Sequence, residues 1–425
     1  MLLSIDNFKS IERVADIDIS SLTVLAGINS SGKSSLIQAL LLLKQTLTSS
    51  SNDILSLNGP YVYANSLMDL MHNKKSGFMK FGVKIIKEEL PNDSITLSKF
   101  KSQPISLEIS VIFRVRTDSV VISEFKMTME YEDGNAFRLR LSHRPRKDVY
   151  DLHSTNRNLT DLVLDGYSFA NFFPIYVNKD GTTYDLWEVK LIREVFIEYL
   201  DKIVYIAPLR VAPVLSRTYQ TDVETRYVLP DGENTRFIID KVSDDEHTLN
   251  LIKEWICNRF HLAKDLSVIK ESGKRYRVVV TTNENVKVDL MHMGFGLSQI
   301  LPIITQGCIS QPNSLLIIED PDVHMHPSIQ ASMADFFIFL CEKRKVAVLI
   351  ETHSDHFITR LRRRIAEKNI TPNIIHLIFV ANDYGESVYQ TIPLSENGKM
   401  EGSMPSGFMD SLDNDFRAIL ETNRR

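Results

Sequence analysis

The stretch VLAGINSSGKSSLIQALLLLKQ, which begins at Val24, constrains the fold of this chain more than any other. Its first apolar residues predict a buried strand, Gly27 to Ser34 predict a loop, and the leucine-rich segment after Lys33 predicts a helix. The loop matches the pattern G-x-x-x-x-G-K-[S/T] at every fixed position. Because such a loop needs a strand before it and a helix after it, the stretch predicts an α/β protein.

The residues of this loop are suited to hold ATP. Glycines allow the backbone N–H groups to curve around a phosphate, and the start of the following helix adds the positive end of its dipole. Lys33 would neutralise phosphate oxygens, and the Ser34 hydroxyl would bind Mg²⁺. A glycine–serine turn that merely precedes a helix is the alternative, but such a turn does not need every fixed position of the pattern. The expected ATP-binding residues of the loop are Asn29, Ser30, Ser31, Gly32, Lys33, Ser34 and Ser35.

Two later apolar runs end in residues that could act on a bound phosphate. In LLIIEDPD the run ends at Glu319 and Asp320, and VAVLIETHS carries His353 near its end. We expect Glu319 to bind Mg²⁺ and Asp320 to orient or deprotonate the attacking water. The imidazole of His353 would reach the terminal phosphate. The alternatives are a strand that ends in solvated charge and, for His353, a structural role.

The residues after these acids suggest a second possibility, which is a metal site. Asp322, His324 and His326 are common metal ligands, and the two histidines would share one face of a strand. However, Pro321 and Pro327 bracket them, which favours a turn and the start of a helix. We therefore do not expect zinc at this place.

The segment MGFGLSQILPIITQ, which precedes the acidic strand, predicts a second anion site. Gly294 and Gly296 give a permissive loop, and Ser298 lies near the start of a helix expected over residues 299–306. Taken alone the signal is weak, because a glycine–serine helix cap occurs in many enzymes.

Composition narrows the class of protein further. The 425 residues carry a formal charge of −5 and 43% hydrophobic residues, as in an ordinary globular protein. The three cysteines are widely spaced, without a disulfide or metal pattern. No apolar run approaches the ~20 residues of a membrane span, and the first residues do not resemble an export signal. We expect a cytoplasmic protein with no membrane segment.

Two local basic clusters leave room for nucleic acid as a partner. Their residues are Arg360, Arg362, Arg363 and Arg364 in one, and Arg144, Arg146 and Lys147 in the other. Such clusters can neutralise phosphates. A helix face whose arginines are solvated and paired with acidic neighbours explains the first cluster as well, and we favour it because the spacing spreads the arginines around the helix.

Strand and helix signals divide the chain into five segments. Alternation in SLEISVIFRVRT and FKMTMEY, with a turn at EDGN, predicts an antiparallel β lobe, whereas EVKLIREVFIEYLDKI and TLNLIKEWICNRF predict helices. Strand–helix alternation returns near the end, so the two α/β ends are expected to form one sheet interrupted by an insertion. The expected segments are 1–50 (first part of the core, with the loop), 51–185 (antiparallel β lobe), 186–265 (helical insertion), 266–365 (second part of the core) and 366–425 (a small hairpin and tail).

Together, the loop, the glycine–serine segment, the acids and the histidine resemble ATP-binding-cassette ATPases of the branch that contains the overcoming-lysogenization-defect nucleases, RecF and the SMC-like repair ATPases. LNGPYVY, YIAPLR, PDGENT, GFGLSQILP, HPSIQ and ETHSDHFITRLRRRIAEKNI look more closely like bacterial AAA-type ATPases that end in a small C-terminal domain, many of them associated with phage defence. The resemblance implies an ABC-type ATPase head with a mixed sheet, an antiparallel β lobe and an inserted helical lobe. It also implies a homodimer in which Gly294, Gly296 and Ser298 of one subunit cap the terminal phosphate held by the loop of the other.

The sequence departs from the family pattern in several places. Family members usually carry Glu-Glu-Pro-Glu after the acidic strand, whereas this chain has Glu-Asp-Pro-Asp from Glu319, and the shorter aspartate implies slow turnover. The glutamine that follows the first lobe in many relatives is not identifiable, and Asp69 lies only in roughly the right region. Nuclease members add a Toprim domain with paired acids. Here HLIFVANDYGESVYQTIPL predicts only a strand–turn–strand, and Asp413 and Asp415 read as the start of a polar helix.

These inferences predict an ATPase, dependent on ATP and Mg²⁺, with no nuclease site of its own. The expected mechanism is a dimer that ATP closes and hydrolysis opens, and whose state a separate effector senses. The resemblance suggests an effector such as an HNH nuclease, held inactive in a Septu-like antiviral assembly. The alternative is a DNA-repair or DNA-clamp ATPase of the RecF or SMC type that grips duplex DNA.

Overall fold

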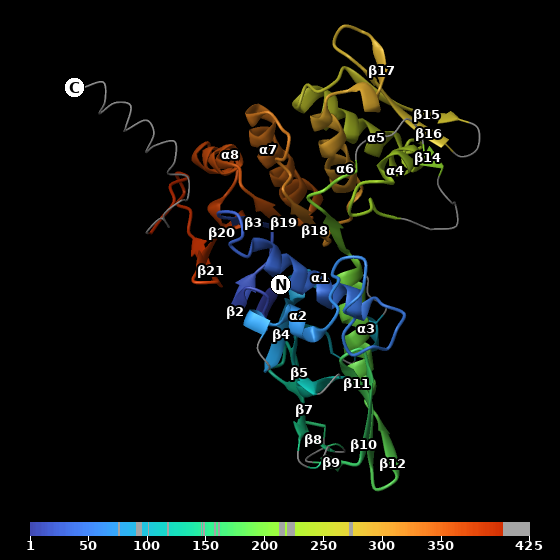
Figure 1. Cartoon of the computed structure of the whole chain (residues 1–425), viewed down its shortest axis with the longest axis vertical. Coiled ribbons are helices and arrows are strands. Elements are labelled where there is room, and N and C mark those ends of the chain that lie inside the picture. The colour runs from blue at the N-terminus through green and yellow to red at the C-terminus, as the bar shows by residue number, and fades with distance from the viewer. Residues whose placement is uncertain are drawn as a thin grey trace, which may run out of the picture. The chain divides into compact units, whose positions relative to one another are not determined.

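A computed structural model gives the fold of the chain (Figure 1). It describes residues 1–402 apart from 75–76, 91–95, 101, 117–118, 146, 148, 157–158, 160–161, 212–216, 219–225 and 272–274. The chain forms two compact units. The first consists of Met1–Ile19, Asn29–Ile203 and Ala381–Tyr389, and the second consists of Ser20–Ile28, Val204–Val380 and the chain from Gln390 onward.

An eight-stranded sheet, in the order β2-β1-β4-β5-β6-β7-β8-β9, forms most of the first unit, and all of its neighbouring strands are antiparallel. Period-two alternation explains these strands, since every second residue of β4 from Met79 to Ile85 is buried. The expected turn at 132–135 joins β6 to β7. The strands are β1 (Leu2–Phe8), β2 (Ile11–Asp18), β4 (Phe78–Ile86), β5 (Pro104–Arg116), β6 (Ser119–Tyr131), β7 (Ala136–Arg144), β8 (Val149–Ser154) and β9 (Leu162–Leu164).

A small antiparallel sheet and two long helices complete the first unit. The sheet has the order β10-β11-β12, with β10 (Gly166–Ala170), β11 (Phe173–Lys179) and β12 (Thr182–Asp185). Helix α1 (Lys33–Leu47) packs on β1 and on α3 (Trp187–Asp201), and the short helix α2 (Leu67–Leu70) lies between α1 and β4 in the sequence. Because its leucine-rich sequence is apolar on nearly every face, α1 is buried over almost its whole length.

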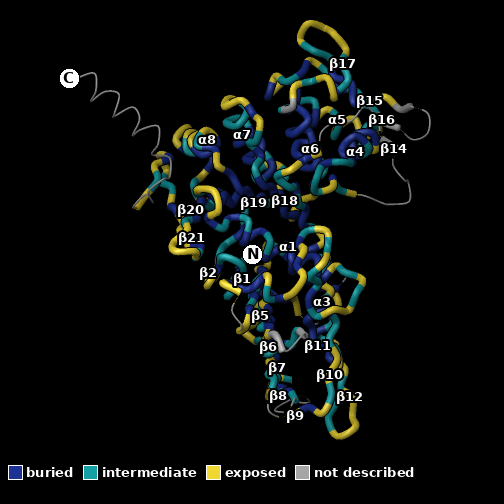
Figure 2. Tube along the Cα trace, viewed as in Figure 1, coloured by how far each residue is buried: buried dark blue, intermediate teal, exposed yellow. Residues whose placement is uncertain are grey.

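Six strands, in the order β13-β18-β19-β3-β20-β21, form a sheet whose central strands belong to the second unit. Neighbouring strands from β18 to β20 are parallel. Strands β3 and β18 are buried at every residue (Figure 2), as expected for continuous apolar runs at the centre of a parallel sheet. The strands are β13 (Ile203–Ile206), β18 (Leu315–Glu319), β19 (Ala347–Thr352), β3 (Leu22–Ala26), β20 (Ile375–Asp383) and β21 (Glu386–Ile392).

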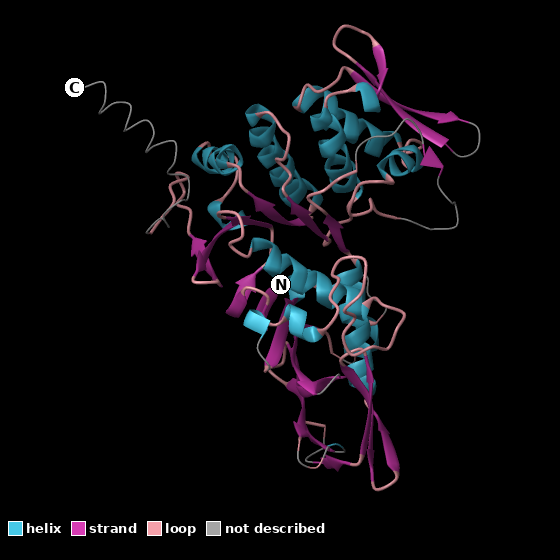
Figure 3. Cartoon of the chain, viewed as in Figure 1, coloured by secondary structure: helices cyan, strands magenta, loops and turns pink. Residues whose placement is uncertain are grey.

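Three helices of the second unit lie over this sheet (Figure 3): α6 (Phe295–Ile309), α7 (Pro327–Arg344) and α8 (Asp355–Ala366). Helix α7 packs on β19, β3 and α8. It begins at Pro327, where the proline signal predicted a helix start, and His326 caps it by accepting a hydrogen bond from the backbone N–H of Ser328. The sequence between β18 and α7 is therefore a turn.

The rest of the second unit combines a smaller sheet with short helices. The sheet contains β14 (Arg217–Thr218), β15 (Asp265–Glu271), β16 (Arg275–Thr281) and β17 (Lys287–Asp289), and the helices are α4 (Thr235–Lys241) and α5 (Glu246–Lys253), which continues as a π-helical turn at Glu254–Arg259. The expected α/β class with an antiparallel β lobe and inserted helices is confirmed. Three strands precede the glycine loop. None of the helices described here is long and apolar enough to span a membrane.

Candidate functional site

The carboxyl ends of three parallel strands lie in one row in the second unit. Glu319 of β18 pairs with Glu351 of β19, and Thr352 of β19 pairs with Ala26 of β3. Gly27, the first residue of the glycine loop, follows Ala26 directly. The register therefore starts the loop at the same edge of the sheet at which Glu319 ends its strand, and this edge is where α/β sheets bind ligands. We call it the acidic edge.

The glycine loop has the backbone of an anion-binding nest. Gly27, Ser30 and Gly32 have positive φ angles of 147°, 60° and 102°, which allow successive N–H groups to point into one concavity. Gly32 stands at the N-cap of α1 and has no side chain of its own to occupy the helix end. Lys33 is buried, and the buried Ser31 hydroxyl has no hydrogen-bond partner among the described residues. These features fit a phosphate group bound at the start of α1.

Glu319 is held by a tyrosine that sequence reasoning did not assign. The hydroxyl of Tyr205, on β13, donates to Glu319 Oε1 at 2.7 Å, and the Glu319 side chain is almost fully buried. Burial, together with the nearby charge of Glu319, raises the pKa of Tyr205 above its usual range. Tyr205 therefore remains a hydrogen-bond donor, which favours the ionised carboxylate that a metal cation would need.

Arg210 connects the acidic strand to helix α6. Its guanidinium donates to four backbone carbonyls, those of Ala207 (3.1 Å), Gln299 (3.1 Å), Glu319 (3.1 Å) and Asp320 (2.6 Å). Burial lowers the pKa of Arg210 to about 10, so it is still charged at neutral pH. The stretch VYIAPLR ends in this arginine, but a single arginine after a short strand gives no signal of such a role.

Asp320 and His353 come together at the acidic edge. The Nε2 atom of His353 lies 4.0 Å from Asp320 Oδ1. Oδ1 is buried and accepts no hydrogen bond from the residues that the structure describes. Asp320 also has a positive φ of 46°, which is uncommon outside glycine, and its N–H donates to the carbonyl of Glu351 at 2.9 Å. A buried carboxylate oxygen that lacks a hydrogen-bond donor in the described part of the chain and lies beside an imidazole suits a residue that positions a water.

Asp322, which the sequence suggested only as a metal ligand, belongs to a hydrogen-bonded turn. It accepts from the Thr352 hydroxyl at 2.7 Å, and burial raises the pKa of its carboxyl group. Gln330 donates to the carbonyls of Asp322 and Met325, and accepts from the Ser354 hydroxyl at 2.7 Å. The part of the chain that the structure describes holds no group of three or more His, Cys, Asp or Glu side chains suited to a metal ion.

The glycine–serine segment lies inside the start of α6. The helix begins at Phe295, earlier than the expected residue 299, so Ser298 is in its first turn and is nearly buried. A Cβ atom on Gly296 would lie 3.3 Å from the carbonyl oxygen of His324, so this glycine permits a close approach to the turn after β18. Gly294 is exposed, and a Cβ there would meet no described atom within 4 Å.

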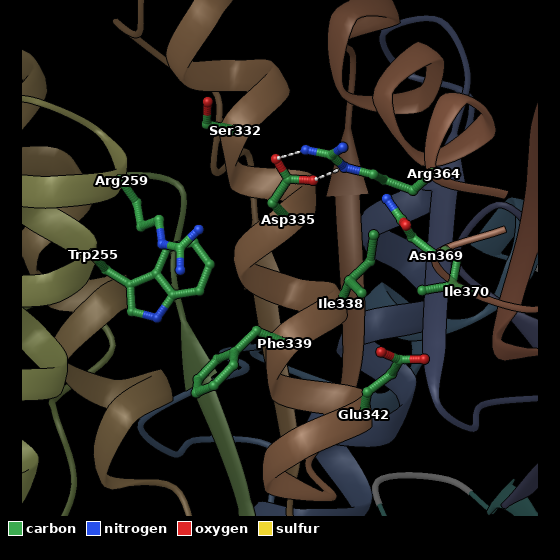
Figure 4. Close-up of a pocket in the computed structure, with 10 residues that line it drawn as sticks. All are labelled: Trp255, Arg259, Ser332, Asp335, Ile338, Phe339, Glu342, Arg364, Asn369 and Ile370. Atoms are coloured by element: carbon green, nitrogen blue, oxygen red, sulfur yellow. Dashed lines mark hydrogen bonds and ion pairs between the residues drawn. The ribbon is translucent and has the colours of Figure 1, made fainter. Parts of the chain in front are cut away.

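The arginines of α8 are engaged in contacts within the second unit. Arg360 and Arg364 both bind Asp335, and Arg363 and Arg364 bind Glu367. Figure 4 shows the Asp335–Arg364 pair at one side of a cavity of about 310 Å³, which Trp255 and Phe339 also line. Arg362 donates to the carbonyl of Gly398. This pairing favours the solvated, paired helix face over a patch for nucleic acid.

Three further predictions concern Asp69, the second basic cluster and a polar helix near the end of the chain. Asp69 accepts hydrogen bonds from the N–H and hydroxyl of Ser66 at the start of α2, so it caps a helix. In the second basic cluster, Arg144 pairs with Asp151, and Arg146 lies outside the described residues. The polar helix expected at 413–415 also lies outside them.

Comparison with known proteins agrees with the expected class of chemistry. Residues 1–198 and 218–358 match a family model described as the AAA ATPase domain. No curated protein matches the chain. Similar solved structures include a SmcHead bound to the C-winged helix domain of ScpA, with 14% identity, 93% of this chain and 98% of that chain covered, and a TM-score of 0.46.

Two further structures are similar at the same level. One is the Smc head domain with an extended coiled coil bound to the C-terminal domain of ScpA from Pyrococcus furiosus, with 13% identity, coverage of 100% and 99%, and a TM-score of 0.43. The other is the SMC head domain from Thermotoga maritima, with 13% identity, coverage of 92% and 98%, and a TM-score of 0.37.

The family match spans most of the chain and includes the glycine loop, the glycine–serine segment and the acidic edge. An ATPase domain binds a nucleotide, typically together with Mg²⁺, and the nest at the start of α1 fits a phosphate. This chain is a nucleotide-dependent ATPase and belongs to the AAA ATPase domain family.

Proposed function

We propose that the protein is a dimeric, ATP-driven switch that controls a separate effector, a nuclease in antiviral defence. The observation that carries the proposal is the row of strand ends at which β18 ends in Glu319 and β3, on the other side of β19, leads into the glycine loop. One edge of one sheet thus supplies both the phosphate loop and the acids. The resemblance of the sequence to phage-defence ATPases supports the effector and the biological setting.

Each residue has a role in this proposal. Lys33 binds the β- and γ-phosphate oxygens, while Ser34 and Glu319 hold Mg²⁺, which when bound neutralises phosphate charge. Asp320 orients the attacking water and takes up its proton, and His353 contacts the terminal phosphate. Tyr205 fixes the Glu319 carboxylate by its 2.7 Å hydrogen bond. Arg210 holds the backbone carbonyls of the two acids.

We further propose that the glycine–serine segment completes the site of a second subunit. Gly294 is exposed at the start of α6, where backbone N–H groups and the helix dipole favour an anion. Ser298, in the same turn, is nearly buried and would act from behind Gly294. ATP bound between two subunits would hold them together, and hydrolysis would release them, which makes the dimer a switch.

The effector is assigned to a separate chain because the resemblance suggests a Septu-like assembly, in which the ATPase holds a separate nuclease inactive. A DNA clamp of the RecF or SMC type is the second candidate. The arginines of α8 that would suit it are engaged with Asp335, Glu367 and a backbone carbonyl, so the contacts favour the switch.

Mixing two inactive variants tests the shared site. Lys33→Ala removes the phosphate-binding charge, and Gly294→Arg places a bulky cation where the structure leaves space for a side chain, so the subunit should still fold. Each variant alone should be inactive, and Gly294→Arg should still bind ATP in calorimetry. A mixture should recover roughly a quarter of the wild-type rate, because about half of the dimers are mixed and each keeps one intact composite site.

The matched control mixes Lys33→Ala with the double variant Lys33→Ala/Gly294→Arg, which offers no intact loop and should stay inactive. If native mass spectrometry shows mixed dimers while the first mixture stays inactive, the shared site is wrong.

A further inference from the structure

We infer that the tip of the β20–β21 hairpin positions the glycine loop, and that Ser387 and Tyr389 are positioning residues for nucleotide binding. We call Ala381–Tyr389, which belongs to the first unit together with Asn29–Ser35, the brace hairpin. The inference rests on the proposed binding of the nucleotide by the glycine loop. It concerns the side of the loop that faces away from the phosphate.

Three successive carbonyls of the loop accept hydrogen bonds from the brace hairpin. Tyr389 Oη donates to the Gly32 carbonyl at 2.8 Å, and Ser387 Oγ donates to the Ser31 carbonyl at 2.7 Å. Asn382 Nδ2 lies 3.4 Å from the Ser30 carbonyl, at the long end of the range. More than 350 residues of sequence separate the hairpin from the loop, so only the fold brings them together.

A partly buried chain of hydroxyls extends the contact. Ser387 Oγ lies 2.7 Å from Ser10 Oγ, which in turn lies 2.8 Å from Ser35 Oγ in the first turn of α1. Because the Ser31 carbonyl can only accept, the single Ser387 proton is needed there, and Ser10 must donate to Ser387. The backbone N–H of Ser387 also donates to the Ser10 carbonyl at 2.7 Å. Ser387 itself is almost fully buried.

The geometry of the peptide bond links these contacts to the N–H groups that would bind a phosphate. In a trans peptide the C=O and the following N–H point in opposite directions from one rigid plane. The carbonyls of Ser30, Ser31 and Gly32 share their planes with the N–H groups of Ser31, Gly32 and Lys33. Donors that hold these carbonyls on the outer side therefore aim three N–H groups towards the inner side, where a phosphate would bind.

The close packing at Gly32 also indicates that the brace hairpin positions the glycine loop. A Cβ atom at this position would lie 1.8 Å from Ser387 Oγ and 2.5 Å from Ser10 Oγ, and Gly32 has a positive φ of 102°. The glycine thus serves two needs, the left-handed backbone and the contact with the hairpin. The motif that suggests phosphate binding explains only the first.

Removal of the two hydroxyls tests the inference. In Tyr389→Phe and Ser387→Ala we expect the dissociation constants for Mg·ATP and Mg·ADP, measured by calorimetry, to rise together, by about five-fold in each variant. The double variant should show a larger rise. In steady-state hydrolysis KM should rise while kcat stays within about two-fold, because the brace acts on binding of the ground state. Tyr384→Phe, at the exposed hairpin tip, is the matched control and should change neither constant.

Two results separate failure of the inference from failure of the proposed function. If Lys33→Ala abolishes binding while both hydroxyl variants bind ATP and ADP like the wild type, the brace has no positioning role. If Lys33→Ala also binds normally, the nucleotide does not use this loop, and function and inference fall together. Should the double variant not fold, Tyr389→Phe decides alone, because it keeps the ring and removes only the hydroxyl.

Discussion

The glycine loop and the acidic edge are both held by side chains that donate to backbone carbonyls, but they use different donors. Behind the loop, the donors are the neutral hydroxyls of Ser387 and Tyr389. At the acidic edge, the donor is the charged guanidinium of Arg210, which binds four carbonyls. The loop is proposed to bind a ligand of high negative charge, whereas the edge must keep its own carboxylates in place.

This difference predicts which property each region should lose when a donor is removed. Loss of one hydroxyl removes one hydrogen bond to the loop, and the Gly32 carbonyl keeps the bond from the Ser35 N–H at 3.0 Å, so the loop should change shape slightly while the unit stays folded. Loss of the guanidinium removes four hydrogen bonds to backbone carbonyls at once, so the second unit itself should be destabilised. We therefore expect the loop variants to change affinity and the edge variants to change stability.

The largest expected effect is that of Arg210→Met on stability. The substitution removes four hydrogen bonds in a buried place, and we expect the free energy of unfolding to fall by about 3–5 kcal/mol, measured by urea denaturation. Arg210→Lys keeps a charge but cannot reach four carbonyls and should recover only part of the loss. A loss below about 1 kcal/mol in Arg210→Met would show that the edge does not depend on this residue.

A buried lysine gives the next effect, and it depends on pH. In the first unit, Lys44 of α1 donates to the carbonyls of Leu200 and Asp201, and burial lowers its pKa from 10.5 to about 8. Between pH 8 and 10.5 the unfolded chain binds this proton and the folded chain does not, so stability due to Lys44 rises with pH. Below pH 8 both states are protonated and this dependence vanishes.

Comparison with Lys44→Met isolates this contribution. From pH 8 to 10.5, the stability of the wild type relative to the variant should rise by roughly 2–3 kcal/mol, measured by denaturation at each pH. Lys74→Met, at an exposed position, is the control and should show no such change. A relative stability that falls with pH would contradict the assigned direction.

The smallest expected effect is that of Tyr205→Phe at the acidic edge. The variant removes the 2.7 Å hydrogen bond to Glu319 and should cost about 1–2 kcal/mol of stability, measured by thermal or urea unfolding. Tyr384→Phe, which removes an exposed hydroxyl, should lie within about 0.5 kcal/mol of the wild type. If the two variants were equally stable, the hydrogen bond from Tyr205 to Glu319 would contribute no more to stability than an exposed tyrosine hydroxyl.

The glycine loop and the acidic strand were predictable from the sequence because each depends on neighbours in the chain. A strand, a glycine pattern and a helix follow one another from Val24, and a buried apolar run ends directly at Glu319. The start of α7 was predictable for the same reason, since Pro327 and His326 act within one turn. The start of α6 was placed too late. Gly294 and Gly296 lower the helix propensity of the segment before Ser298, so this segment did not read as helical.

The supports of the site could not be predicted, because they act across long sequence separations. Tyr205 contacts Glu319 over 114 residues, and Tyr389 contacts Gly32 over 357. A tyrosine in a strand or a serine in a hairpin has no local pattern that distinguishes a supporting hydroxyl from an ordinary one. Only the strand order, which places β13 beside β18 and β20 beside β3, makes these contacts possible.

Hydrolysis of ATP by Asp320→Asn, compared with the wild type, tests the account most directly. The substitution keeps the shape of the side chain and removes the carboxylate that we propose takes up the proton. ATP binding, measured by calorimetry on the same samples, should remain within a few-fold of the wild type, while single-turnover hydrolysis should fall by about 100-fold or more. Hydrolysis at the wild-type rate in this variant would contradict the assignment of Asp320 and place the base elsewhere.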